Sequence, residues 1–149
     1  MKKLLSILLA GAMLFGNTAG LWAASTATVT IAITITHSKD IVVGGSANGT
    51  IIPGTPTVFG AITVQNVGTG VGETIKLALD PTTPLPTGWT AYYQFAATKP
   101  AAGDAGWKTA ADIAEALASN ETKNLWLKLV PPAKTEEVSL AIKLAINAT

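Results

Sequence analysis

The chain has 149 residues, enough for one domain with a hydrophobic core but not comfortably for two. Only 13% of the residues are charged, the formal net charge is +1, and every basic residue is a lysine, so the composition argues against a nucleic-acid or phosphate partner. The chain has no cysteine for disulfides, and its one histidine, His37, excludes the common zinc sites.

The first 23 residues have the features of a cleaved secretory signal peptide. Lys2 and Lys3 form a basic start, residues 4–15 are an apolar run too short to span a membrane, and Ala23 ends a small-residue cleavage site. We therefore expect a mature protein that is secreted, extracellular or on the cell surface, with no membrane segment after cleavage. Without the two lysines, eight basic residues face nine acidic ones, and this net charge of −1 leaves little repulsion between copies.

Residues 26–36 alternate strictly in side-chain type and contain no charge, proline or glycine. A strand would place four β-branched side chains on one face, namely Val29, Ile31, Ile33 and Ile35. Such a strand tends to pair with another chain if its own domain leaves it unpaired. Residues 24–38 are therefore either the first strand of their own sheet or a strand donated to a neighbouring molecule.

Short strands separated by turn residues are predicted for the middle of the chain. Gly44 and Gly45 form a turn, which is also a candidate hinge behind the first strand. A proline-rich loop, residues 80–88, cannot lie inside a sheet. The predicted strands are residues 41–43, 58–66, 74–79 and 89–95.

The last third of the chain predicts one short helix and two further strands. Residues 109–118 are rich in alanine and begin like a capping box, which favours a helix. Leu125, Leu127 and Leu129 indicate one strand, and residues 136–146 a second. The second strand has Val138, Leu140, Ile142, Leu144 and Ile146 on one face. Residues 24–149 are therefore predicted to form an all-β domain, an antiparallel β-sandwich of jelly-roll or immunoglobulin-like type with one short helix.

A family resemblance is carried by residues 53–68, which contain a Pro-Gly turn and an Asn-x-Gly strand end, and by the following strand with Ile75, Leu77 and Leu79. This stretch resembles the second strand of secreted immunoglobulin-like and jelly-roll modules. With the Trp-Ala-Ala junction at residues 22–24 and the hydrophobic C-terminal strand, the chain is similar to the TasA/camelysin family of biofilm-matrix fibre proteins. It lacks room for the large insertions of the bacterial members, and compact archaeal pilus subunits resembling the family fit its length better.

The resemblance implies a structural subunit of an extracellular fibre, pilus or biofilm matrix, assembled by donor-strand complementation. The expected partner is another copy of the chain, with other matrix or cell-surface components as further partners. Val29, Ile31, Ile33 and Ile35 would be the donor residues, and Val138, Leu140, Ile142, Leu144 and Ile146 the candidate acceptor sheet. From the residues alone, the first strand of the protein's own sandwich remains the alternative.

A carbohydrate-binding or adhesion module is the alternative function. In the predicted register Tyr92 and Trp126 point away from the core, where exposed aromatic rings can stack on sugars. An enzyme is not expected, because His37 lies in a polar turn without a nucleophile motif. We predict no catalytic residue, cofactor or metal site. Three N-glycosylation sequons begin at Asn48, Asn120 and Asn147.

Overall fold

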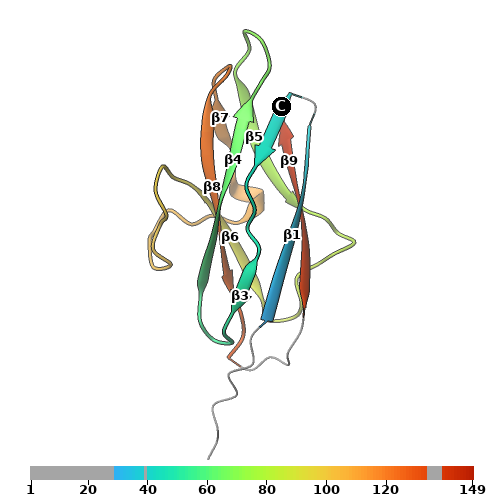
Figure 1. Ribbon diagram of the computed structural model, residues 1–149, viewed down its shortest axis with the longest axis vertical. Helices are drawn as coiled ribbons and strands as arrows, with labels where there is room; N and C mark the ends of the chain where they lie inside the picture. Colours follow the sequence, from blue (N-terminus) through green and yellow to red (C-terminus); the bar gives the residue numbers. More distant parts are fainter. Residues whose placement is uncertain (1–28, 39, 134–138) are drawn as a thin grey trace, which may run out of the picture.

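Two β-sheets packed face to face make up the computed structural model, which describes residues 29–38, 40–133 and 139–149 (Figure 1). The predicted β-sandwich is therefore confirmed. The strands are β1 Val29–His37, β2 Ile41–Gly44, β3 Gly49–Ile51, β4 Thr57–Asn66, β5 Glu73–Leu79, β6 Thr90–Phe95, β7 Glu115–Leu117, β8 Thr122–Val130 and β9 Leu140–Ala148. A single 3-10 turn, Ala110–Asp112, completes the described elements.

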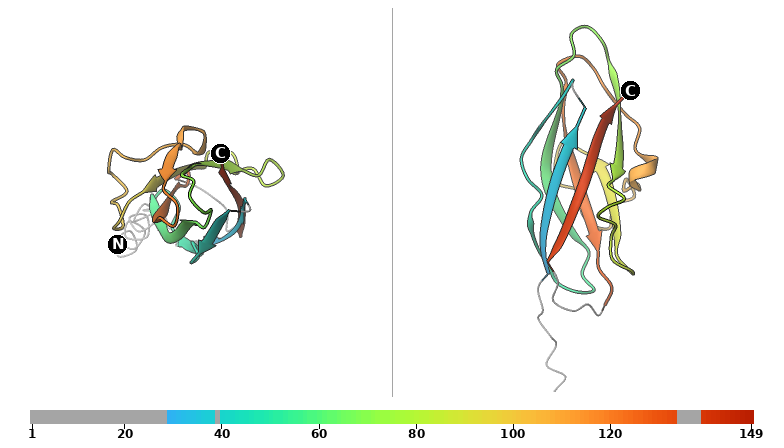
Figure 2. Two further views of the ribbon diagram at one scale, coloured as in Figure 1. Left: turned by 90° about the horizontal axis from the view of Figure 1, so that it is seen from above. Right: turned by 90° about the vertical axis from the view of Figure 1, so that its right-hand side faces the viewer.

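One sheet has five strands in the order β3-β1-β9-β5-β7, and the other has four in the order β2-β4-β8-β6. The chain leaves the first sheet after β1, pairs as β2 with β4 in the second sheet, and returns as β3 to pair with β1. β1 and β9 run parallel to each other, whereas the other pairs of described strands are antiparallel. The prediction of a wholly antiparallel sandwich is corrected at this one pair (Figure 2).

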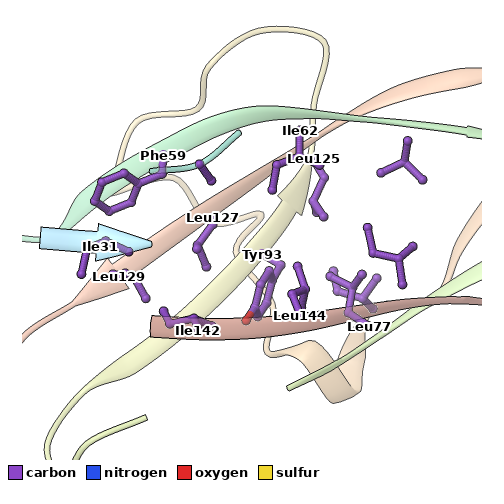
Figure 3. Close-up of a cluster of buried hydrophobic side chains, with 14 of the residues drawn as sticks. Ile31, Phe59, Ile62, Leu77, Tyr93, Leu125, Leu127, Leu129, Ile142 and Leu144 are labelled. Atoms are coloured by element: carbon purple, nitrogen blue, oxygen red, sulfur yellow. The ribbon is translucent and has the colours of Figure 1, made fainter. Parts of the chain in front are cut away.

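The core lies between the sheets and is made by alternate residues of the long strands, as their periodicity predicts. Leu125, Leu127 and Leu129 of β8 are each at most 1% exposed. Figure 3 shows Tyr93 of β6 between this row and Leu144 of β9. The Tyr93 side chain is 1% exposed and its hydroxyl has no hydrogen-bond partner among the described residues, so burial raises the pKa of Tyr93.

Residues 109–118 do not form the predicted helix. Only Ala110–Asp112 form a 3-10 turn, and residues 115–117 continue as β7, which pairs with β5. Thr109 Oγ1 does donate to Asp112 Oδ2 at 2.5 Å, but the turn stops at Ile113. Ile113 and Leu117 are both buried, because the edge of the first sheet offers them core contacts that a free helix would not have. Tertiary packing has overridden the local helix preference.

Asn66 is the polar residue at the end of β4 and is fully buried. Its Nδ2 donates to the carbonyl oxygens of Val71 at 3.0 Å and Leu117 at 3.2 Å, and its Oδ1 accepts from the Gly68 N–H at 2.8 Å. These bonds satisfy the amide group inside the protein and tie the β4–β5 turn to β7. The Asn-x-Gly pattern therefore marks a structural junction between the two sheets.

Candidate subunit-contact site

The two sets of residues predicted to make the subunit contact lie in neighbouring strands of one sheet. β1 pairs with β9 from Ile31 opposite Leu140 to His37 opposite Ile146. Figure 2 shows the two strands side by side along most of the length of the sandwich. In this arrangement the candidate donor strand and the candidate acceptor sheet belong to the same molecule. Val138, also predicted for the acceptor, lies outside the described residues.

The inward face of this pair becomes less buried along β1. Val29 is 0% and Ile31 1% exposed, whereas Ile33 and Ile35 are only partly buried against the core. The four described acceptor residues are all buried, namely Leu140, Ile142, Leu144 and Ile146. The inward side chains in the first half of β1 are therefore more deeply buried in the core than those in the second half.

The outward face of β1 is polar and uncovered. Thr30, Ala32, Thr34 and Thr36 are exposed, so β1 buries one of its two faces. The contact that β1 makes with its sheet is therefore a row of main-chain hydrogen bonds together with one row of aliphatic side chains. Neither part depends on a charge, and any identical strand supplied by another copy would offer the same groups.

The connection between β1 and β2 is short and hydrogen-bonded. Ser38 donates its N–H to the Ile146 carbonyl oxygen at 3.0 Å, and its Oγ accepts from the Ala148 N–H at 2.9 Å. Gly44 belongs to β2, where it pairs with Thr63 of β4. The hinge expected at Gly44 and Gly45 therefore does not separate β1 from the rest of the domain, and residues 38–40 are the segment where the chain changes sheet.

The outer edge of β1 is only half covered. β3 pairs with residues Val29 to Ile31 and then turns away at Gly49. The next bond along this edge of β1 comes from a side chain instead of a strand. Asn48, the residue before β3, accepts the Ile33 N–H with its Oδ1 at 2.9 Å. Beyond that bond no described strand pairs with this edge of β1.

The two aromatic candidates for sugar stacking do not form an exposed platform. Trp126 is 8% exposed, and its Nε1 donates to the Ala96 carbonyl oxygen at 3.0 Å. Tyr92 is half-buried, with Lys128 Nζ 4.7 Å from the centre of its ring. The expectation of two free rings is wrong because the chain after β6 folds back over the outer face of the second sheet.

Lys128 contacts the loop after β6 that covers this face of the second sheet. Its Nζ lies 4.9 Å from the ring centre of Trp107 and donates to the Ala102 carbonyl oxygen at 3.1 Å. Desolvation by these neighbours lowers the pKa of Lys128, with a smaller opposing effect from Asp104. The side chain thus joins the sheet, Tyr92 and the loop by cation–π contacts and one hydrogen bond.

A hollow of about 400 Å3 lies between β6, β7 and β8. It is lined by Phe95, Ala96, Ala97, Glu115, Thr122, Lys123 and Asn124. Lys123 Nζ bonds Glu115 Oε1 at 2.6 Å and thereby bridges the two sheets at the rim of the hollow. This hydrogen bond raises the pKa of Lys123. The sequence pattern gives no sign of the hollow, because it places Glu115 on a helix.

The three sequon asparagines are all exposed. Asn48 is in the segment before β3, Asn120 has a φ of 62° in the turn before β8, and Asn147 lies near the end of β9. His37 is also exposed, and its Nδ1 lies 3.1 Å from the Ser38 carbonyl oxygen. Across residues 29–38, 40–133 and 139–149, no three His, Asp or Glu side chains gather closely enough to hold a metal ion.

Comparison with protein-family models and with curated proteins gives no match to this chain. Within the part of the chain that the structure describes, no helix is long and apolar enough to cross a membrane.

Proposed function

We propose that the protein is a secreted structural subunit that assembles into an extracellular fibre, pilus or matrix by donating β1 to the next copy. The observation that carries the proposal is the pairing of β1 with β9. β1 is the first described strand, residues 38–40 link it to β2 in the other sheet, and it is held by main-chain bonds and aliphatic side chains. The slot between β3 and β9 can therefore accept the same strand from another copy.

A second argument for strand exchange is the geometry of the connection. A short segment that links β1 to a strand in the other sheet favours domain swapping, because the released strand can satisfy the same contacts in a neighbour. A head-to-tail exchange repeats from copy to copy and generates an open filament. The near absence of charge on β1 and β9 keeps that contact insensitive to salt, since only Lys143 among the paired residues of β9 is charged.

The experiment is a disulfide trap across the β1–β9 register in a chain without its own cysteines. Thr34 lies opposite Lys143, and both side chains are exposed. Mature protein carrying Thr34→Cys is mixed with protein carrying Lys143→Cys, allowed to assemble and oxidised. If β1 pairs between copies, peptide mapping will find a disulfide that joins position 34 of one chain to position 143 of another, and electron microscopy will show filaments.

Two controls make the trap interpretable. The double variant Thr34→Cys/Lys143→Cys reports pairing within one chain, and it should cross-link in the unassembled monomer. The mixture of Thr34→Cys with Val42→Cys places the second thiol in the other sheet and should give no such link, since Val42 is 48% exposed but pairs with Gln65. Cross-links confined to the double variant at every concentration would refute donation of β1.

A further inference from the structure

The hollow between β6, β7 and β8 lies where β6 ends before its partner strand does. β6 pairs with β8 as far as Phe95 opposite Leu125, and residues 122–124 of β8 extend beyond that pair. The chain after β6 leaves the sheet, and the space beside these residues is the hollow. Its volume of about 400 Å3 is within the range of about 300–1,000 Å3 that small-ligand sites have.

One part of the lining is apolar. Phe95 is half-buried, so part of its side chain packs against the core and part stays accessible. Ala96 and Ala97 follow it, and their small side chains leave room beside the ring. An accessible aromatic ring in a recess is the usual partner for the C–H face of a sugar.

The other part of the lining offers hydrogen-bond acceptors. Asn124 Nδ2 donates to the Ala97 carbonyl oxygen at 3.2 Å, and Lys123 Nζ donates to Glu115 Oε1 at 2.6 Å. Both bonds hold their side chains in place. Among the described residues, Asn124 Oδ1 and Glu115 Oε2 have no hydrogen-bond partner. A ligand that fits the hollow therefore brings donors, as the hydroxyl groups of a sugar do.

The charges at the rim are already engaged with one another. Besides Glu115, Lys123 Nζ lies 3.7 Å from Glu121 Oε1 and donates to the Ala116 carbonyl oxygen at 2.8 Å. An anionic ligand would meet two carboxylates, and a cationic ligand would compete with Lys123 for them. A neutral ligand can bond the remaining acceptors without breaking these pairs, which favours an uncharged polyhydroxylated molecule.

We propose that the hollow binds one pyranose ring of a neutral glycan. Phe95 packs against one face of the ring, and Glu115 and Asn124 accept hydrogen bonds from its hydroxyl groups. A single ring with a few such contacts binds with a dissociation constant in the millimolar range. The site is distinct from the pair of aromatic rings predicted from the sequence, because neither Tyr92 nor Trp126 lines the hollow.

The hollow is separate from the strand exchange proposed above. In the five-stranded sheet, β9 and β5 lie between β1 and β7, so the hollow is at the side of the sandwich away from β1 (Figure 1). It keeps the same lining whichever copy supplies β1. In a fibre, each copy would present one such site, and many weak sites in a row would hold a glycan polymer firmly.

The test is a titration of the mature protein with monosaccharides, followed by NMR of its amide groups. The neutral probes are the methyl glycosides of glucose, galactose, mannose and N-acetylglucosamine. Glucuronate and glucosamine serve as probes with a negative and a positive charge. We expect a neutral probe to shift the amide signals of Ala97, Lys123 and Asn124, with those of β1 unchanged, and to bind more tightly than either charged probe.

Two matched variants show whether the hollow is the site. In Glu115→Gln, the side-chain oxygen can still accept from Lys123, but an NH2 group replaces the second oxygen. This variant should weaken binding of the neutral probe about tenfold. Glu121→Gln makes the same change beside Lys123 but outside the lining of the hollow, and it should leave binding unchanged. Because both glutamates are about one-third exposed, both variants should stay folded.

A third variant tests the ring. Phe95→Leu keeps an apolar side chain at the edge of the core and removes the flat face, so it should also weaken binding about tenfold. The proposal would be overturned if no neutral probe shifted the three amide signals, if a charged probe bound more tightly, or if Glu115→Gln and Glu121→Gln had equal effects.

The outcomes also separate this proposal from the fibre proposal. Sugar binding by a protein that stays monomeric would support the hollow and count against exchange of β1. Filaments that bind none of the probes would do the reverse.

Discussion

The β4–β8 and β1–β9 pairs are both long, but they hold their strands in different ways. β8 is covered on both faces, since Leu127 faces the core and Trp126 lies under the loop that follows β6. β1 is covered on one face, and half of one of its edges pairs with no described strand. The comparison shows that alternation predicts a strand equally well in both places but does not reveal whether the strand is fixed or exchangeable.

The two pairs also differ in how their strands are connected to the rest of the domain. β4 and β8 are interior strands of their sheet, with β2 and β6 as outer neighbours. β1 follows no other described strand and joins the next one, β2, through residues 38–40. Releasing β1 would cost the contacts of a single strand, whereas releasing β8 would dismantle the four-stranded sheet. Regions with fewer buried contacts open at lower free energy.

The largest expected effect is in β8. Replacing Leu127, which is 1% exposed, with alanine should lower the free energy of unfolding by about 3 kcal/mol, because a cavity forms in the centre of the core. Urea unfolding followed by circular dichroism measures the loss. Lys76→Ala at an exposed position of β5 is the control and should change it by less than about 0.5 kcal/mol. A small loss for Leu127→Ala would mean that β8 is no more firmly held than β1.

An intermediate effect is expected within β1 itself. Ile33→Ala should lower the free energy of unfolding of the monomer by about 1 kcal/mol, because Ile33 is only partly buried, whereas Ile31→Ala should cost about 2 kcal/mol. Urea unfolding of both variants compares how much each half of the strand contributes to the free energy of unfolding. Equal losses would show that β1 is held uniformly, and would weaken the case that its second half is available for contacts between copies.

The smallest effect is expected at the ion pair that bridges the sheets. Lys123→Met should lower the free energy of unfolding by less than about 1 kcal/mol, since both partners are about one-third exposed. The bond to Glu115 raises the pKa of Lys123 above its ordinary value of 10.5, so this stabilisation is present at neutral pH and is lost as the pH rises through the raised pKa. Glu115→Gln keeps an acceptor for the lysine and should cost less than Lys123→Met. A larger loss for either variant would make this pair a main support of the sandwich.

Much of the fold could be predicted from the sequence, and the reason is side-chain periodicity. The strands expected around Ile62, Ile75, Tyr93 and Leu127 all occur, and these four residues are all buried. In each case one face of the strand must leave water, and a period of two residues identifies that face without knowledge of its neighbours.

The candidate site was predicted in part. β1 lies beside β9 in the same molecule, as expected for a first strand that belongs to its own sandwich, and a contact of these residues between copies stays a prediction. The cover over Trp126 was not predicted, because it comes from a loop whose own sequence has no periodicity. The ring platform was therefore inferred from strand register alone, which gives the direction of a side chain but not what lies above it.

By itself, the sequence determined that this is a weakly charged, cysteine-free chain whose alternating segments form the strands of a sandwich, the first of them an uncharged strand. Only the tertiary structure decided that β1 lies parallel to β9, that residues 115–117 form a strand, and that β3 pairs with only the first residues of β1. The physical reason is that periodicity is a local property, set by which face of a strand is buried. Pairing partners and uncovered edges depend on residues far apart in the chain, which come together only when both sheets have formed.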